Sequence, residues 1–271
     1  MSEIVVIGAG AIGRGYLPWV FRERGHDLVF VDTDEAIVRR MREAGEFAVY
    51  QVRGGELERL VVPVKAAYTP AEFDLARHAG AAAVFVNVGP RRAAQAARLV
   101  DGISGPVILC ENDPATVDEV KATTALERVY FAVPDVIASN TAPPHLLAAD
   151  PLSVVTEAGI LFVDDRATGL DGELTAISTD ELLRKQWTAK LYLHNTPHCV
   201  AAYLGALVGV TYVHEAMAIP EVEEIVRGAM TEMLNSLKLE WDISHAFLDW
   251  YAEKELNRFA CELLYDPISR V

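Results

Sequence analysis

A glycine-rich segment near the N-terminus constrains the fold of this chain more than any other feature. Residues 8–13 read GAGAIG. The apolar run at residues 4–7 predicts a buried strand in front of them, and a helix is predicted behind them, from about Ile12 to Glu23. A strand, a glycine turn and a helix in this order begin a sheet that binds dinucleotides, with the pyrophosphate at the first N–H groups of the helix.

Each glycine of this segment has its own role in such a site. Gly8 permits the tight turn, Gly10 lets the backbone approach a pyrophosphate, and Gly13 lets the helix pack closely on the sheet. The sequence therefore predicts that the loop binds the cofactor through Gly8, Gly10, Ala11, Ile12 and Gly13.

A second apolar run, at residues 28–31, predicts a strand that ends at the acidic residue Asp32. In such folds the acid at this place accepts hydrogen bonds from the ribose hydroxyls of adenosine, and its negative charge repels a 2′-phosphate. We therefore predict NAD as the cofactor in preference to NADP. The alternative is a turn or helix-capping role for Asp32, and the nearby Asp34 competes for either assignment.

Strand-like and helix-like segments alternate through the first part of the chain. Apolar runs at residues 82–88 and 106–110 predict further strands, and apolar residues at helical spacing predict helices at residues 35–44 and 91–100. Strands that are apolar on both faces and alternate with helices are typical of an α/β protein with a doubly wound parallel sheet.

The pattern changes after a β-rich stretch at residues 151–163 and a polar segment at residues 164–180. From there on, apolar residues recur at helical spacing. We therefore predict a Rossmann-type NAD-binding domain at residues 1–179, followed by a mainly α-helical catalytic domain at residues 180–271.

Charge and composition argue against several classes of function. The net charge is −15, and such a surface repels nucleic acid and anionic lipid, which are bound chiefly by positive charge. The chain has no apolar run of about 18 residues, so we expect no membrane span. Three widely separated cysteines without CxxC spacing argue against a disulfide scaffold and a structural zinc site, and favour a cytoplasmic protein.

The segment richest in reactive side chains is residues 190–198, which read KLYLHNTPH. Oxidation of an alcohol by a hydride-accepting cofactor needs a base for the hydroxyl proton, and a lysine can act when its pKa falls to roughly 7–8. Lys190 has apolar neighbours that could bury it. Asn195 carries an amide that can donate to the developing alkoxide, and His198 can hold a neighbouring hydroxyl.

An ideal α-helix would not bring all of these groups to one face. At about 100° per residue, His198 lies roughly 80° from Lys190, whereas Asn195 lies roughly 140° away. Pro197 predicts a kink or break near Asn195 that would turn the amide. A solvated lysine and hydrogen-bonded core histidines are the alternatives, and for His194 we prefer the core role. No further ligand stands at a suitable spacing from the two histidines, so we predict no metal.

These motifs together resemble the polyol-specific long-chain dehydrogenases, the mannitol dehydrogenase group. The matching stretches are GAGAIGRG at residues 8–15, VGP at 88–90, CEN at 110–112 and the Lys-x4-Asn-x2-His string at 190–198. The resemblance covers nearly the whole chain. It implies zinc-independent, NAD-linked oxidation of a sugar alcohol or its phosphate, or reduction of the matching ketose.

The resemblance also implies roles for single residues. Lys190 would be the general acid/base, Asn195 and Asn112 would bind the reacting oxygen, and His198 would position the substrate. Asn112 also follows the strand at residues 106–110, at the edge where such sheets bind ligands, although an Asx turn would explain it as well. The second cofactor loop would consist of Val88 and Gly89, for which a simple strand-ending turn is the alternative.

The chain departs from the family pattern on the substrate side. Residues 134–137 read PDVI where relatives read Val-Asp-Arg-Ile, so Asp135 is kept and the arginine is not. The Arg-Phe-x-Asn-Pro segment of relatives is kept only as Arg258-Phe259. Asp135 and Arg258 are therefore candidates for substrate contacts. Relatives continue beyond residue 271, and we expect a shortened substrate pocket.

Three rival functions stay open at this point. A sugar acid such as altronate or mannonate would be the substrate if the pocket held an additional arginine. Hydroxyacid and 6-phosphogluconate dehydrogenases also pair a lysine with an asparagine, at a shorter spacing. A redox sensor of low catalytic power would bind NADH tightly and turn over no polyol.

Overall fold

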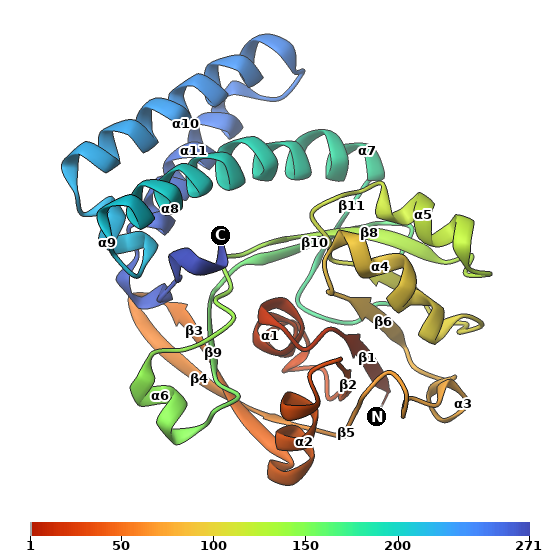
Figure 1. Cartoon of the computed structure of the whole chain (residues 1–271). Coiled ribbons are helices and arrows are strands. Elements are labelled where there is room, and N and C mark those ends of the chain that lie inside the picture. The colour runs from red at the N-terminus through yellow and green to blue at the C-terminus, as the bar shows by residue number, and fades with distance from the viewer. Residues whose placement is uncertain (1) are drawn as a thin grey trace. The chain divides into compact units, whose positions relative to one another are not determined.

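An eight-stranded sheet is the framework of the first of two units into which the chain divides, Met1–Leu182 and Leu183–Val271. The structure is a computed structural model and describes residues 2–271. The strands lie in the order β11-β10-β8-β7-β6-β1-β2-β5 (Figure 1). Their bounds are β1 Glu3–Ile7, β2 Asp27–Val31, β5 Ala66–Tyr68, β6 Ala83–Val86, β7 Val107–Leu109, β8 Val129–Asp135, β10 Ile160–Asp164 and β11 Thr175–Ile177.

Most of this sheet is parallel. The strands from β8 to β5 run in one direction, whereas β10 is antiparallel to β8 and β11 is parallel to β10. Apolar side chains cover both faces: along β1, Ile4 and Val6 join one cluster of buried residues, while Val5 and Ile7 join another. The predicted α/β fold class is confirmed, because a parallel sheet with two buried faces is the doubly wound arrangement.

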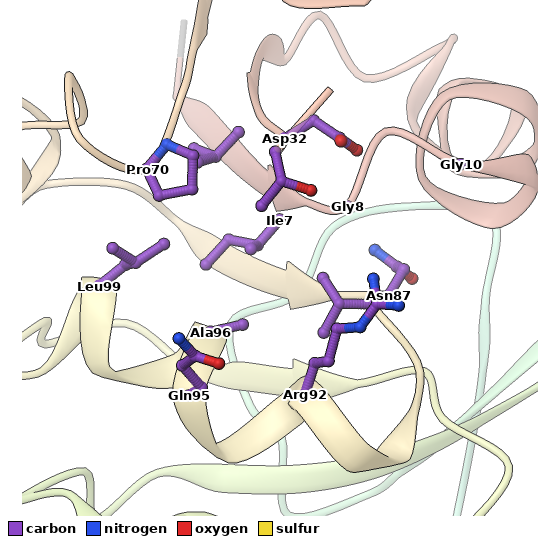
Figure 2. Close-up of a pocket in the computed structure, with 13 residues that line it drawn as sticks. Ile7, Gly8, Gly10, Asp32, Pro70, Asn87, Arg92, Gln95, Ala96 and Leu99 are labelled. Atoms are coloured by element: carbon purple, nitrogen blue, oxygen red, sulfur yellow. The ribbon is translucent and has the colours of Figure 1, made fainter. Parts of the chain in front are cut away.

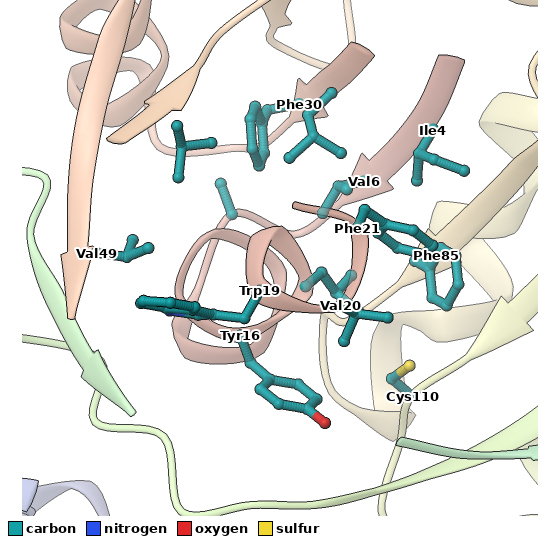
Figure 3. Close-up of a cluster of buried hydrophobic side chains, with 14 of the residues drawn as sticks. Ile4, Val6, Tyr16, Trp19, Val20, Phe21, Phe30, Val49, Phe85 and Cys110 are labelled. Atoms are coloured by element: carbon teal, nitrogen blue, oxygen red, sulfur yellow. The ribbon is translucent and has the colours of Figure 1, made fainter. Parts of the chain in front are cut away.

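Helices pack against each face of the sheet. On one face, the glycine loop leads into the π-helix η1, Ala11–Tyr16, and then into α1, Leu17–Phe21. Figure 3 shows Phe21 of this segment beside Phe85 of β6, and their ring centroids are 5.3 Å apart. On the other face lie α4, Pro90–Ala97, and α5, Thr116–Thr123. The remaining helices of the unit are α2 Glu35–Ala44, α3 Leu75–His78, η2 Arg98–Val100, α6 Pro144–Ala149 and α7 Thr179–Glu181.

A second, three-stranded sheet lies in the same unit, in the order β4-β3-β9. Strands β3, Glu46–Arg53, and β4, Glu56–Pro63, form a hairpin, and β9, Val154–Glu157, pairs with β3 in parallel. The hairpin was not predicted, although the Gly54–Gly55 pair between alternating residues is a hairpin signal. Gly15 of η1 packs directly on β9, because a Cβ atom there would lie 2.6 Å from Val154 Cγ2.

The second unit is helical, as predicted. Two π-helical segments, η3 Leu182–Trp187 and η4 Lys190–Asn195, precede α8, Thr196–Val208. Then follow α9 Val213–Met217, α10 Pro220–Glu240, α11 His245–Phe259, η5 Glu262–Leu264 and η6 Ile268–Arg270. Helices α8, α9, α10 and α11 pack together around buried residues such as Val226 and Leu248. Among residues 2–271, no helix is long and apolar enough to cross a membrane.

The structure differs from expectation at Pro197. The helix continues through this residue, which is the second residue of α8 and follows η4 almost directly. The preceding turn, η4, is π-helical instead of being broken. A proline ring clashes with the carbonyl of the residue four positions earlier in an α-helix. The wider π turn, with its hydrogen bonds to the fifth residue, relieves this clash without interrupting the helix.

Candidate cofactor and catalytic sites

The glycine loop in the first unit has the geometry that dinucleotide loops need. Gly8 has a φ of +94°, and a Cβ atom on it would lie 2.5 Å from the carbonyl oxygen of Asn87. A Cβ atom on Gly13 would lie 1.9 Å from the carbonyl oxygen of Gly8. At Gly10, by contrast, a Cβ atom would meet nothing within 4 Å, so the loop faces open space at the position predicted for a pyrophosphate.

The two acids after β2 have separate roles. Asp32 accepts the N–H of Ala9 through Oδ2 at 2.6 Å and the N–H of Asp34 through Oδ1 at 2.8 Å. Asp34 is the N-cap of α2 and accepts the N–H groups of Ala36 and Ile37. Asp34 is therefore occupied at the helix, while Asp32 holds the glycine loop and retains lone pairs for a further donor.

A cavity of about 370 Å³ opens between the glycine loop and α4. Figure 2 shows Asp32 and Pro70 on one side of it and the α4 side chains Arg92 and Gln95 on the other. Of the predicted cofactor residues, Gly8, Gly10, Asp32 and Val88 line the cavity. Ala11, Ile12 and Gly13 lie in the π-helical turn that follows, and Gly89 is the N-cap of α4.

Asn87 is a lining residue that the sequence did not single out as functional. It follows β6, and both polar atoms of its amide are buried without a hydrogen-bond partner within residues 2–271. An unpartnered buried amide costs about 1–3 kcal/mol. This orphaned amide, the open face of Gly10 and the acid Asp32 fit a dinucleotide, in which a pyrophosphate joins two riboses that each carry a flat ring.

Arg14 is a second residue that sequence reasoning passed over. Its side chain is 6% exposed, and within residues 2–271 it donates to backbone carbonyls alone: to Ala9 at 2.5 Å, to Leu152 at 2.8 Å and to Asn140 at 3.4 Å. Burial lowers the pKa of Arg14, and the charge of Asp32 opposes that effect. Asp32 thus accepts the N–H group of Ala9, and Arg14 donates to the carbonyl oxygen of Ala9. Both backbone groups of this loop residue are therefore fixed by side chains.

The Cys110-Glu111-Asn112 triplet follows β7 at the carboxyl edge of the sheet. Asn112 is exposed there, and Asp135 is the buried last residue of the neighbouring β8. Glu111 is buried, and its Oε1 accepts the N–H groups of Val88 and Gly89. Burial raises the pKa of Glu111 to about 7, although the two N–H groups oppose that rise.

In the second unit, the π-helical turn η4 changes the relation between two predicted catalytic residues. Lys190 and Asn195 are its first and last residues. Because π-helical hydrogen bonds join residues five apart, these two positions stack on adjacent turns, whereas an α-helix would separate them by roughly 140°. Both side chains are half-buried. The π-helix therefore brings positions 190 and 195 to one face, whereas the sequence predicts that a kink or break near Asn195 turns the amide.

The two histidines of the same helix form a buried polar cluster. His194 Nδ1 lies 2.5 Å from Glu255 Oε2, and His198 Nε2 lies 2.8 Å from Asp266 Oδ2. The two rings are 5.1 Å apart, and Phe259 stacks on His198 at 5.3 Å. Burial lowers the pKa of His194 to about 4, although Glu255 opposes that effect. His194 therefore occupies the hydrogen-bonded core role that was preferred for it.

Every arginine of the second unit is paired with an acid. Arg258, a predicted substrate contact, pairs with the fully buried Glu255, and Arg270 bonds to Asp266 at 2.8 Å. Arg184 and Arg227 pair with Asp242 and Glu223. Burial opposes a low pKa for Asp266, but the bonds from His198 and Arg270 outweigh it and lower that pKa. Within the described residues, no three His, Cys, Asp or Glu side chains are grouped to hold a metal ion.

The glycine loop and the catalytic helix can be compared with known proteins. The family described as "Mannitol dehydrogenase C-terminal domain" matches residues 183–271. A mannitol-1-phosphate 5-dehydrogenase of Bacillus velezensis is 30% identical over 97% of this chain and 76% of its own length. The enzyme of the same name from Bacillus pumilus is 28% identical over the same shares.

Solved structures share the fold. A Pseudomonas fluorescens mannitol 2-dehydrogenase, in a ternary complex with NAD and D-mannitol, matches with a TM-score of 0.78 and 17% identity over 99% of this chain and 70% of its own. A D-sorbitol dehydrogenase matches with a TM-score of 0.69 and 14% identity, covering 98% of this chain and 71% of its own. Since the first relative is similar over nearly the full length of this chain, the chain belongs to the mannitol dehydrogenase family.

Proposed function

We propose that this protein is an NAD-dependent oxidoreductase that interconverts a sugar alcohol, or its phosphate, and the matching ketose. The observation that carries the proposal is the cavity beside the glycine loop, which combines open backbone at Gly10 with the carboxylate of Asp32. Membership in the mannitol dehydrogenase family supplies the class of substrate.

The first unit binds the cofactor in this proposal. Gly10 and the first turn of η1 receive the pyrophosphate, because a helix begins there and the space beside Gly10 is open. Asp32 accepts the ribose hydroxyls of adenosine and disfavours a 2′-phosphate by its charge. Bound NAD supplies the hydride acceptor. The glycine loop stays fixed during binding because Asp32 and Arg14 already hold the peptide of Ala9.

The second unit moves the proton. Lys190 takes the proton of the substrate hydroxyl at Nζ, and Asn195, one π-helical turn away, donates its amide to the same oxygen. His198 orients a neighbouring hydroxyl, and Asp266 fixes its ring. The family resemblance makes Asn112 the candidate for a second amide donor to the substrate. Because Arg258 is paired with the buried Glu255, we assign Arg258 a structural role in the second unit. Asp135 remains the candidate for an acidic contact with the substrate.

The phosphate group of the substrate is a finer question within this proposal. The similar relatives are named for mannitol 1-phosphate, which favours a phosphate ester. The pairing of all the arginines of the second unit with acids favours the free sugar alcohol, because a phosphate needs positively charged donors.

One assay separates these possibilities. The purified chain is mixed with NAD and, in separate reactions, with sugar alcohols, their 1-phosphates and aldonates, and the absorbance of NADH is followed. The proposal expects NADH only with a sugar alcohol or its phosphate. Turnover of an aldonate alone would assign a sugar-acid oxidoreductase. Tight NADH binding without turnover of any of these compounds would assign a redox sensor.

A further inference from the structure

Glu111 connects the candidate catalytic edge of the sheet to the wall of the cofactor cavity. It lies between Cys110 and Asn112, directly after β7, and its side chain is 5% exposed. Oε1 accepts the N–H of Val88 at 2.9 Å and the N–H of Gly89 at 3.2 Å. The carboxylate thus reaches from one strand end to the loop that follows the neighbouring strand, β6.

The loop that Glu111 holds forms one wall of the cavity. Val88 lines the cavity, and Gly89 is the N-cap of α4, which contributes Arg92, Gln95 and Ala96 to the same wall. Gly89 has a φ of +87° and no side chain of its own to cap the helix, and Glu111 accepts its N–H group instead. The two hydrogen bonds to one oxygen therefore fix the start of α4, while Ala93 and Ala97 pack the helix onto the sheet.

The same loop touches the glycine loop on the other side of the cavity. A Cβ atom on Gly8 would lie 2.5 Å from the carbonyl oxygen of Asn87 and 3.0 Å from Val88 Cγ1. The two walls thus meet at their base with no free space between them. A shift of Val88 away from Glu111 would change the width of the cavity and the support of the glycine loop together.

A buried acid at this position needs a reason, because burial of a carboxylate without a charged partner is costly. A carboxylate oxygen accepts several N–H groups at once and is favoured by the positive end of α4. These properties suit a group that must fix two adjacent peptides. An apolar side chain of equal size would fill the space and leave both N–H groups unpaired.

We propose that Glu111 is a positioning residue for the cofactor: by accepting the N–H groups of Val88 and Gly89, it fixes the α4 wall of the cavity at the width that a dinucleotide requires. This inference rests on the proposed function of the cavity. It assigns the middle residue of the triplet to the cofactor, while its neighbour Asn112 is assigned to the substrate.

The test compares variants that keep or remove the acceptor. Glu111→Gln retains an oxygen that can accept both N–H groups, whereas Glu111→Met has similar volume and no such oxygen. Glu119→Met, on the exposed side of α5, is the matched control. The dissociation constant of NADH is measured by fluorescence titration without any polyol, and the KM values for NAD and for the polyol are measured separately.

We expect Glu111→Met to weaken NADH binding by about tenfold, because part of the binding free energy must then restore the position of the Val88–Gly89 loop. Glu111→Gln should keep most of the affinity, and the control should equal the wild type. The KM for NAD should rise in Glu111→Met while the KM for the polyol stays constant, a division that a general loss of structure would not produce.

Two results would overturn the inference alone: wild-type NADH affinity in Glu111→Met, or equal losses in the Gln and Met variants. If Glu111→Met does not fold, Glu111→Asp replaces it, because the shorter acid keeps the charge and cannot reach both N–H groups; wild-type affinity in that variant would likewise overturn the inference. Failure of the folded wild type to bind NADH would instead refute the proposed function, and the inference with it.

Discussion

Replacement of the buried carboxylate of Glu111 by an amide should make the stability of the protein less dependent on pH. Burial raises the pKa of this group from 4.5 to about 7 in the folded chain. At about 1.36 kcal/mol for each pH unit, that rise corresponds to about 3 kcal/mol of folding free energy. Glu111→Gln cannot titrate, so it lacks this contribution.

The sign follows from the direction of the pKa change. Between pH 4.5 and about 7 the folded chain holds the Glu111 proton and the unfolded chain has lost it, so the free energy of unfolding falls as pH rises. The contribution is complete below the unfolded pKa and is lost above the folded one. Relative to the wild type, Glu111→Gln should therefore gain about 3 kcal/mol between about pH 4.5 and pH 8.

Urea unfolding of both proteins at a series of pH values measures this difference directly. All other titrating groups are common to the two proteins, so they cancel in the comparison as long as unfolding is two-state. Thermal unfolding should show the same trend, with a shift of roughly 6–10 °C in relative Tm across the range. A stability difference that is constant over the whole range would refute the assignment of a raised pKa to Glu111.

Three further predictions concern the proposed reaction. Lys190→Ala should lower kcat by about 10²-fold or more while the dissociation constant of NADH stays unchanged, and near-normal turnover would remove Lys190 from the mechanism. Asp32→Ala should weaken NAD binding by about tenfold and reduce the preference for NAD over NADP, measured by titration with both dinucleotides; an unchanged preference would exclude the ribose role. Prolonged treatment with EDTA should leave turnover intact, and activity that is lost with the chelator and restored by Zn²⁺ would contradict a lysine-based reaction.

The parallel sheet could be predicted because its signals are local. Uncharged runs such as Ile4 to Ile7 are recognisable without tertiary information, and Asp34 and Gly45 bound α2 through a side-chain cap and a left-handed residue. The only local signal of the β3–β4 hairpin is the Gly54–Gly55 pair at its turn. Its strands have charged residues on the exposed face, which obscured the alternation.

The candidate sites could be predicted only in part. Motif positions predict roles for Asp32 and Lys190, but the sequence analysis assumed an α-helix and did not predict the π-helical turn between Lys190 and Asn195. The partners of buried polar groups are distant in sequence: Asp266 lies 68 residues from His198, and Leu152 lies 138 residues from Arg14. Such pairs depend on tertiary packing, which spacing along the chain does not encode.

Transfer of a labelled hydride tests the central claim most directly. A sugar alcohol carrying deuterium at its carbinol carbons is incubated with the protein and NAD, and the reduced cofactor is analysed by mass spectrometry. The account predicts NADH that is heavier by one deuterium, and it predicts that Lys190→Ala forms this product about 10²-fold more slowly than the wild type. Absence of deuterium from the cofactor, with the sugar alcohol and its phosphate both tested, would contradict it.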